Sequence, residues 1–406
     1  MLPRRIIQRR NPRPRRGIGS PLAVVLAGSL IAVACGDSSS RSPPEPQIQL
    51  TFVIQPSDTS AFALMSPVAV AVTDDTGATK DGSVSIAIDP NTCGATLSGT
   101  LNVATQNGVA TFTDLGINLP TDGYVLKATF ESATATSVAF NVATTAVGGT
   151  LTEQAAICIT PRVQQDAASL AYVPQDDAFW TTDDNLPGVH VFARTTGAFL
   201  DTIRADEFLS IFPGGADPCD DGDSNPATSC SYINEFEVVT ADPATGNIYV
   251  INTVNDPNLM PPVDRPAIFR LIRQNCASCF FLDEWRPLPG GFAYDGAIVI
   301  NGELWIADGP NLYAYDFASN TVDILTEKVL PRNVRDLAFD GSSLWAQHKD
   351  DLREYEWPSG NQLAVHDLNV FSVDDPSGLE VVDNTLYVIE GHTGNPVRRF
   401  TETPPP

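Results

Sequence analysis

Short segments of alternating apolar and polar residues run through residues 48–147. Two of them are VAVAV at 68–72 and VSIAI at 84–88, and turn sequences such as DDTG at 74–77 separate the segments. Alternation with a period of two, broken by turn signals every eight to twelve residues or so, is typical of short antiparallel strands packed in two layers. We therefore expect a β-sandwich domain over residues 48–147.

A different pattern covers residues 155–401, where apolar segments that end in an aromatic residue recur. The aligned aromatics are Trp180, Tyr249, Trp305, Trp345 and Tyr387. The later spacings are near 40 residues, and insertions at 205–232 and 253–266 lengthen the earlier ones. A repeat of this period with four short strands in each unit predicts a β-propeller. Five blades are visible, and six are possible if one insertion contains a degenerate blade.

The last repeat stops after its third strand, at residues 397–400. A ring of blades cannot leave strand edges exposed, so another segment has to supply the missing outer strand. The apolar segment at 157–160, just before the first repeat, is suited to this position. The expected fold is thus all-β: a sandwich followed by a propeller that its own first strand closes.

Three segments of the first domain resemble bacterial immunoglobulin-like domains of the invasin and intimin type. They are NGVATF at 107–112, GYVLKA at 123–128 and SVAFNV at 137–142. The resemblance implies an immunoglobulin-like domain of about one hundred residues. In that family the module usually acts as a spacer that holds another domain away from a membrane.

The second domain resembles NHL-type and gluconolactonase-like propellers. Its units carry an apolar inner strand, a polar turn such as DG at 340–341, then Leu-Trp or Leu-Tyr, and Ala-Asp or Ile-Glu two residues later. The resemblance implies the architecture, and a fold by itself does not determine the activity it carries.

The N-terminus has the composition of a lipoprotein signal peptide. Residues 1–16 contain seven Arg and no acid, residues 22–34 are largely apolar, and the segment AVAC at 32–35 resembles a bacterial lipobox. An apolar stretch of this length is shorter than the roughly 20 residues of a membrane span. The resemblance implies acylation of Cys35, a Ser- and Pro-rich tether over 36–47, and attachment to the outer membrane, on either its extracellular or its periplasmic face. Ordinary secretion with cleavage near Ala34 is the alternative.

The chain is strongly acidic, with 24 Lys and Arg against 49 Asp and Glu and a formal net charge of −25. Nucleic-acid binding requires clustered Lys and Arg, so this balance excludes nucleic acid as a natural partner. An acidic surface keeps an exported protein soluble and attracts divalent cations or basic partners.

Six cysteines remain once Cys35 is assigned to lipid, and an even number in an exported protein predicts disulfides. The six are Cys93, Cys158, Cys219, Cys230, Cys276 and Cys279. The two pairs that are close in sequence, Cys219 with Cys230 and Cys276 with Cys279, suggest local staples. This leaves Cys93 with Cys158, a bond that would connect the two domains.

Polar residues at the starts of the inner strands line the central channel of a propeller. The candidates in this chain are Asn234, Glu235, Asp295 and Asp336. Carboxylates and amides are the ligands that Ca²⁺ prefers. In gluconolactonase-like propellers, an equivalent ring binds the divalent metal that activates water or polarises the lactone carbonyl. Strand and turn capping is the alternative role for these four residues.

A second candidate for Ca²⁺ is the acidic loop between Cys219 and Cys230. Asp221, Asp223 and Asn225 alternate there as in a calcium loop, although the terminal bidentate Glu of the helix-loop-helix type is absent. A solvated insertion closed by a disulfide is the alternative interpretation.

The sequence contains neither a G-x-S-x-G nor an H-E-x-x-H motif, so it gives no support for a serine hydrolase or a zinc protease. We expect a monomeric, lipid-anchored protein whose propeller binds a protein or a glycan at the cell envelope. The alternative is a divalent-metal-dependent lactonase or esterase-like propeller enzyme.

Overall fold

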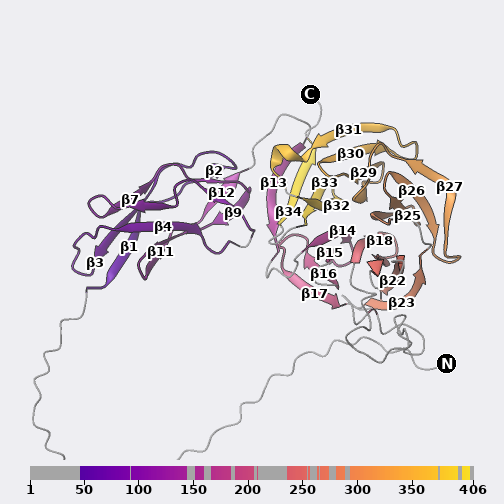
Figure 1. The fold of residues 1–406 in the computed structure, drawn as a ribbon, viewed down its shortest axis with the longest axis horizontal. Helices are drawn as coiled ribbons and strands as arrows, with labels where there is room; N and C mark the ends of the chain where they lie inside the picture. Colours follow the sequence, from indigo (N-terminus) through magenta and orange to yellow (C-terminus); the bar gives the residue numbers. More distant parts are fainter. Residues whose placement is uncertain are drawn as a thin grey trace, which may run out of the picture.

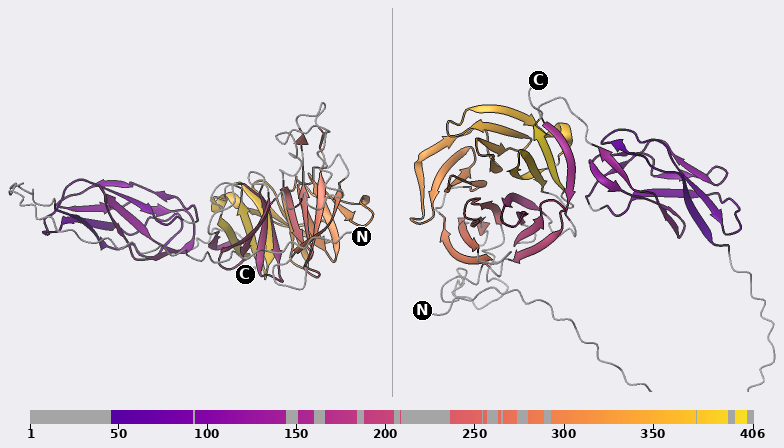
Figure 2. Two further views of the ribbon diagram at one scale, coloured as in Figure 1. Left: turned by 90° about the horizontal axis from the view of Figure 1, so that it is seen from below. Right: turned by 180° about the vertical axis from the view of Figure 1, so that it is seen from behind.

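The computed structural model describes residues 46–91, 93–143, 151–159, 166–183, 188–204, 208, 236–253, 255–256, 263–264, 266–273, 280–288, 293–373, 375–391 and 396–402. These residues form an elongated N-terminal β-domain and a C-terminal propeller, shown face-on in Figure 1 and from the side in Figure 2. The fold is therefore all-β, as predicted. Within the described residues, the structure contains no helix with the length and apolar character of a membrane span.

The N-terminal domain packs its sheets around one hydrophobic core. One sheet has the order β1 (Ile48–Ile54), β3 (Val68–Asp74), β7 (Val109–Phe112), and a second has the order β11 (Ala133–Thr136), β10 (Leu126–Phe130), β4 (Ser83–Ile88), β6 (Asn102–Ala104). The smaller sheets are β2 (Thr59–Ser60), β12 (Phe140–Ala143), β9 (Thr121–Tyr124), and β5 (Leu97–Ser98) with β8 (Gly116–Ile117). Along β10, Leu126, Ala128 and Phe130 are buried while Lys127 and Thr129 are half-buried, as the alternation predicts.

The propeller consists of five four-stranded antiparallel sheets, one to a blade. Blade 1 is β14 (Ala167–Val173), β15 (Ala178–Asp183), β16 (Gly188–Ala193) and β17 (Phe199–Arg204); blade 2 is β18 (Phe236–Ala241), β19 (Ile248–Asn252), β22 (Ala267–Arg273) and β23 (Phe280–Pro287). Blade 3 is β24 (Gly296–Ile300), β25 (Glu303–Asp308), β26 (Asn311–Asp316) and β27 (Thr321–Val329); blade 4 is β28 (Asp336–Phe339), β29 (Ser343–Gln347), β30 (Asp351–Glu356) and β31 (Gln362–Asp367). A short 3₁₀ turn, η2 (Leu368–Phe371), follows blade 4, and β20 (Asn255–Asp256) pairs with β21 (Val263–Asp264) inside blade 2.

Blade 5 combines the two ends of the propeller. Its strands β32 (Pro376–Val382), β33 (Thr385–Glu390) and β34 (Pro396–Glu402) are completed by β13 (Leu151–Cys158) as the outer strand. Ile157 is opposite Val397 in the β13–β34 register, which confirms the predicted closure. The closing strand begins at Leu151, before the boundary expected at residue 155, because its polar first half also pairs with β34.

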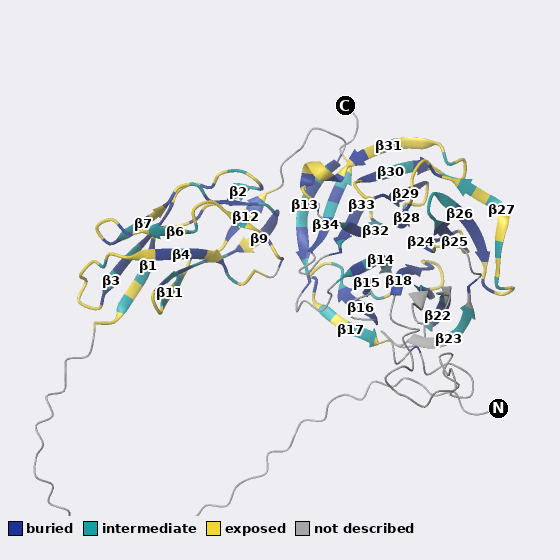
Figure 3. Cartoon of the chain, viewed as in Figure 1, coloured by how far each residue is buried: buried dark blue, intermediate teal, exposed yellow. Residues whose placement is uncertain are grey.

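The ring closes with five blades. The inner strands β14, β18, β24, β28 and β32 contact one another in this cyclic order, and β32 contacts β14. Each of the five hydrophobic clusters in the propeller joins residues of two neighbouring blades. The repeated aromatics belong to these clusters: Trp180, Trp305, Trp345 and Tyr387 are 2–6% exposed. Figure 3 shows strands of the blades such as β26 and β33 largely in the dark blue of buried residues.

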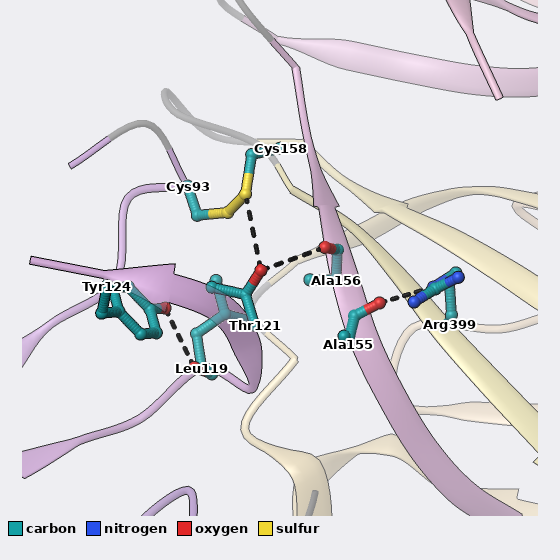
Figure 4. The surroundings of a disulfide bond; sticks show 8 residues. All are labelled: Cys93, Leu119, Thr121, Tyr124, Ala155, Ala156, Cys158 and Arg399. Carbon is teal, nitrogen blue, oxygen red and sulfur yellow. Dashed lines mark hydrogen bonds between the residues drawn. A yellow bond between two sulfur atoms is a disulfide. The ribbon is translucent and has the colours of Figure 1, made fainter. Parts of the chain in front are cut away.

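The two domains are covalently connected next to the closing strand. Cys93 forms a disulfide with Cys158, the last residue of β13, with a Cα–Cα distance of 4.7 Å. Beside it, the Ala156 amide donates to the Pro120 carbonyl at 2.9 Å and the Thr121 hydroxyl contacts the Ala156 carbonyl, as Figure 4 shows in part. The predicted interdomain disulfide is thus confirmed. The other predicted pairs, Cys219 with Cys230 and Cys276 with Cys279, and Cys35 lie outside the described residues.

Candidate sites at the channel and between blades 3 and 4

Asp336 begins the inner strand of blade 4, and its carboxylate reaches two other blades. Oδ2 accepts hydrogen bonds from the backbone amides of Leu170 in blade 1, at 3.1 Å, and Leu379 in blade 5, at 2.9 Å. The Ser169 hydroxyl adds a third bond to Oδ2, at 3.2 Å, while Oδ1 accepts from the Leu337 amide at 2.9 Å. One side chain therefore connects three inner strands across the channel.

The close approach of these strands depends on a glycine. A Cβ on Gly378 of β32 would lie 2.7 Å from the Leu170 nitrogen and 2.7 Å from the Ser169 carbonyl carbon. Contacts this short with backbone atoms exclude any larger residue unless the strands move apart. Gly378 thus lets β32 approach β14 closely enough for Asp336 to bond to both.

Asp336 is buried away from water. The residue is 1% exposed, and burial raises the pKa of its carboxyl well above the ordinary value, against the lowering effect of the amides of Leu379, Leu337 and Leu170. Buried carboxylates are retained where hydrogen bonds satisfy their oxygens. Because donors within the protein already engage both oxygens, Asp336 fits a structural acceptor better than a metal ligand.

Asp295 lies at the mouth of the channel, immediately before β24. Its Oδ2 accepts a hydrogen bond from the Gly309 amide at 2.7 Å, and the neighbouring Asp308 accepts one from the Ala293 amide at 2.8 Å. Burial raises the pKa of the Asp295 carboxyl, and the negative charge of Asp308 raises it further. A Cβ on Gly296 would lie 3.3 Å from the Asp336 Cα, so the strands that carry Asp295 and Asp336 start side by side.

An ion pair joins the residues that precede the inner strands of blades 4 and 5. Arg335 Nη1 lies 2.6 Å from Asp375 Oδ1 and also donates to the Pro376 carbonyl at 3.2 Å. The mouth therefore combines acids with a paired cation. Among the residues that the structure describes, no group of three or more His, Cys, Asp or Glu side chains has a geometry suited to a metal ion.

Several predicted ligands are not placed. Asn234 and Glu235 lie outside the described residues, as do Asp221, Asp223 and Asn225 of the alternative calcium loop. Of the predicted mouth residues, the structure brings the strands of Asp295 and Asp336 together and assigns the Asp336 oxygens to backbone amides. The Ca²⁺ site at the mouth remains a prediction.

A regularity of the second strands was missed in the sequence. The second strand of each blade ends in a residue with a carboxylate or an amide: Asp183, Asn252, Asp308, Gln347 and Glu390. Gln347, opposite Asp336 in the strand register, is fully buried, and neither side-chain amide atom has a hydrogen-bond partner in the described part of the chain. The repeated spacing of these residues, two or three positions after each aligned aromatic, was visible in the sequence.

A groove of about 280 Å³ lies between blades 3 and 4. Its lining consists of Ile300, Asn301, Glu303, Trp305, Thr326, Lys328, Trp357 and Pro358. The two indoles meet edge to face with ring centroids 4.9 Å apart. Trp305 is 6% exposed and Trp357 is half-buried, so Trp357 supplies most of the accessible aromatic surface.

The groove follows from the register of blade 3. Trp305 is opposite Ala314, and Lys328 is opposite Leu312; Ala314 and Leu312 both face blade 4 in the cluster that joins the two blades. Cross-strand partners point to the same side of a sheet, so Lys328 also faces blade 4. A register shift in β27 places Thr326 beside the Ala314 amide, which donates to the threonine hydroxyl at 2.9 Å. Bulges of this kind are frequent next to functional sites.

Three polar side chains of the groove have no protein partner within the described ranges. The side chains of Asn301, Glu303 and Lys328 make no hydrogen bond or ion pair with any residue there. Neither indole nitrogen of the groove donates a hydrogen bond within those ranges. The groove therefore offers an aromatic surface together with an amide, a carboxylate and an ammonium group that are free to bind a ligand.

The sequence indicated only part of this groove. Trp305 marked the repeat in the sequence; in the structure it packs in the inter-blade cluster, and it also lines the groove. Trp357 lies outside the repeat, in the turn between β30 and β31, and its spacing gave no signal.

Comparisons with known proteins assign no family. No protein-family model matches the chain, and no curated protein matches it significantly. The structure is similar to that of glutaminyl cyclase from Myxococcus xanthus, with a TM-score of 0.41, 12% identity, and coverage of 60% of this chain and 93% of the other.

Two further solved structures have comparable values. For a gluconolactonase, XC5397 from Xanthomonas campestris, the TM-score is 0.34 at 10% identity, covering 62% of this chain and 89% of the other. For the soluble aldose sugar dehydrogenase from Escherichia coli, the TM-score is 0.37 at 9% identity, covering 60% and 99%. These neighbours are β-propeller proteins. At such values their activities say nothing about the activity of this chain.

Proposed function

We propose that this chain is a binding protein of the bacterial cell envelope whose propeller binds a carbohydrate in the groove between blades 3 and 4. The observation that carries the proposal is the combination of the half-buried Trp357 indole with three polar side chains that have no partner among the described residues. A sugar ring has apolar C–H faces and polar hydroxyl edges. It therefore matches a site in which an aromatic surface lies beside hydrogen-bonding groups.

The volume of the groove favours a small ligand. Small-molecule sites commonly enclose about 300–1,000 Å³, and the groove, at about 280 Å³, is just below that range. It suits one or two sugar rings better than it suits a protein surface, which requires a contact of about 800 Å² on each partner.

The rest of the chain would serve to present this groove. We propose that acylated Cys35 anchors the protein to the outer membrane and that the N-terminal domain, of immunoglobulin-like type, acts as a spacer. The Cys93–Cys158 disulfide and the backbone bond from Ala156 to Pro120 support a fixed connection between spacer and propeller. A fixed connection holds the groove in a constant orientation to the spacer.

The enzymatic alternative, a divalent-metal-dependent lactonase or esterase, has weaker support. It requires mouth carboxylates with oxygens available to a metal ion, whereas backbone amides and Ser169 engage the oxygens of Asp336. Asp295 retains a mouth position, but its Oδ2 also accepts a backbone amide. The binding function is accordingly preferred.

The test is a glycan array probed with the full chain in detergent micelles, followed by calorimetric titration of the oligosaccharides retained. Trp357→Ala should weaken binding about tenfold or more, because truncation of a central aromatic anchor commonly costs about 2 kcal/mol. Phe62→Ala, which truncates an aromatic side chain 52% exposed on the N-terminal domain, is the matched control. Binding that Trp357→Ala leaves intact would remove the groove as the site.

A further inference from the structure

Lys328 is a cation of the groove that no carboxylate neutralises within the described residues. Elsewhere Lys80 lies 2.9 Å from Asp74, and Lys127 lies 2.7 Å from Asp89. Lys328 is half-buried in the groove and forms no ion pair with any residue that the structure describes. Its ammonium group therefore has an unsatisfied charge facing the place where a ligand would bind.

Glu303 is the acidic residue of the groove, and it lies at the end of the groove away from Lys328. In the strand registers Lys328 is opposite Leu312, and Leu312 is opposite Ala307, four residues along β25 from Glu303. Four residues of a strand span about 13 Å. The two side chains thus start from distant points, with the indole of Trp305 between them, and a ligand can meet the carboxylate at one end and the ammonium at the other.

From this arrangement we infer that the groove recognises an acidic sugar, a hexuronic acid residue whose carboxylate pairs with Lys328 while Glu303 and Asn301 bind hydroxyl groups. The inference rests on the proposed carbohydrate-binding function and specifies its ligand. Lys supplies a single point charge, which can pair with a carboxylate without the two parallel hydrogen bonds that Arg forms. In a hexuronic acid the carboxylate is attached directly to the sugar ring, so the ring and the charge can occupy the groove together.

The net charge of the protein does not prevent this selectivity. At physiological ionic strength charges separated by more than about 8 Å are largely screened when exposed to solvent. The acids of the distant surface then have little effect on a carboxylate in the groove, and contact with Lys328 dominates. The acidic surface slows the approach of an anionic ligand, which is an effect on the association rate.

Matched pairs of disaccharides test the inference on the full chain in detergent micelles. The probes are cellobiose with cellobiouronic acid, and digalactose with digalacturonic acid, each titrated by calorimetry. At least one uronic member should bind about tenfold more tightly than its neutral partner, the gain expected from one charge-assisted pair. Lys328→Gln should abolish the preference, and Lys328→Arg should restore most of it.

Lys349→Gln is the control, because Lys349 is an exposed lysine outside the groove. It should leave the preference unchanged, and circular dichroism should show that every variant is folded. The inference would be overturned if the unaltered protein bound neutral and acidic disaccharides equally, or if the preference survived Lys328→Gln. In either case, sugar binding that depends on Trp357 would still uphold the proposed function. Retention of no glycan on the array and no binding of either disaccharide pair would overturn both.

Discussion

The guanidinium of Arg398 and the carboxylate of Glu153 form a buried ion pair between the last and first strands of the propeller. Arg398 Nε donates to Glu153 Oε1 at 2.5 Å, across 245 positions of the sequence. Arg398 also donates to Glu390 and to the Phe371 carbonyl, both at 2.8 Å. The strand pairing that closes the ring is therefore reinforced by a satisfied buried cation.

Replacement of Arg398 by Met should destabilise the closure strongly. It leaves Glu153, which is 1% exposed, without its partner, and breaking a buried pair on one side costs about 3–5 kcal/mol. Urea unfolding of the full chain measures the loss. Lys127→Met, at an exposed pair with Asp89, should cost no more than about 1 kcal/mol. Equal losses in the two variants would contradict the closing role of Arg398.

The contribution of Glu380 to the stability of the propeller should decrease as the pH rises from about 5 to 8, whereas the buried His190, His348 and His366, whose pKa values burial lowers, contribute in the opposite direction. Burial raises the pKa of Glu380 to about 7, above the 4.5 of an exposed Glu. The folded state then holds a proton that the unfolded state has already released, so folding becomes less favourable as pH rises from 4.5 through 7.

Glu380→Gln should flatten this pH dependence. The Gln carbonyl keeps one acceptor for the amides of Tyr172 and Val381, which donate to the two Glu380 oxygens at 2.7 and 2.9 Å. Between pH 5 and pH 8, the thermal unfolding midpoint of the variant should rise relative to that of the unaltered chain. An unchanged difference would show that Glu380 does not titrate in this range.

Reduction of the disulfide between Cys93 and Cys158 should loosen the connection between the domains. The bond closes a loop across 65 positions, and disulfides of this kind commonly stabilise by about 2–4 kcal/mol. Cys93→Ser with Cys158→Ser should broaden the distribution of interdomain distances measured by electron-spin labels on the two domains. A distribution as narrow as that of the oxidised protein would mean that the noncovalent contacts alone fix the junction.

Asp336→Asn should destabilise the propeller and leave any Ca²⁺ affinity unchanged. Asn keeps one acceptor oxygen, so either the Leu337 amide or the amides of Leu170 and Leu379 lose their acceptor, at about 1–3 kcal/mol for each buried group. Urea unfolding and calcium titration of the same sample separate the two effects. A folded variant that lost Ca²⁺ binding would show that Asp336 is a metal ligand after all. Asp295 would then be the next candidate ligand, and Asp295→Asn would test it.

Much of the architecture was determined by local sequence. Alternation placed strands such as β10, and the recurring aromatics located the blades, because each blade must bury the same face against its neighbour. The truncated last repeat predicted β13 as the closing strand. The pairing of Cys93 with Cys158 followed once the two local pairs had been set aside.

The roles of the site residues were decided only by tertiary structure. The sequence placed Asp336 at the channel, but the amides that engage it belong to Leu170 and Leu379, which only ring closure brings together. The groove likewise depends on a register shift in β27 that sets Lys328 opposite Leu312, and on a turn of the next blade that brings Trp357 against Trp305. Alternation specifies which face a residue occupies. Strand register and contacts between blades are set by packing of distant segments, which no local pattern encodes.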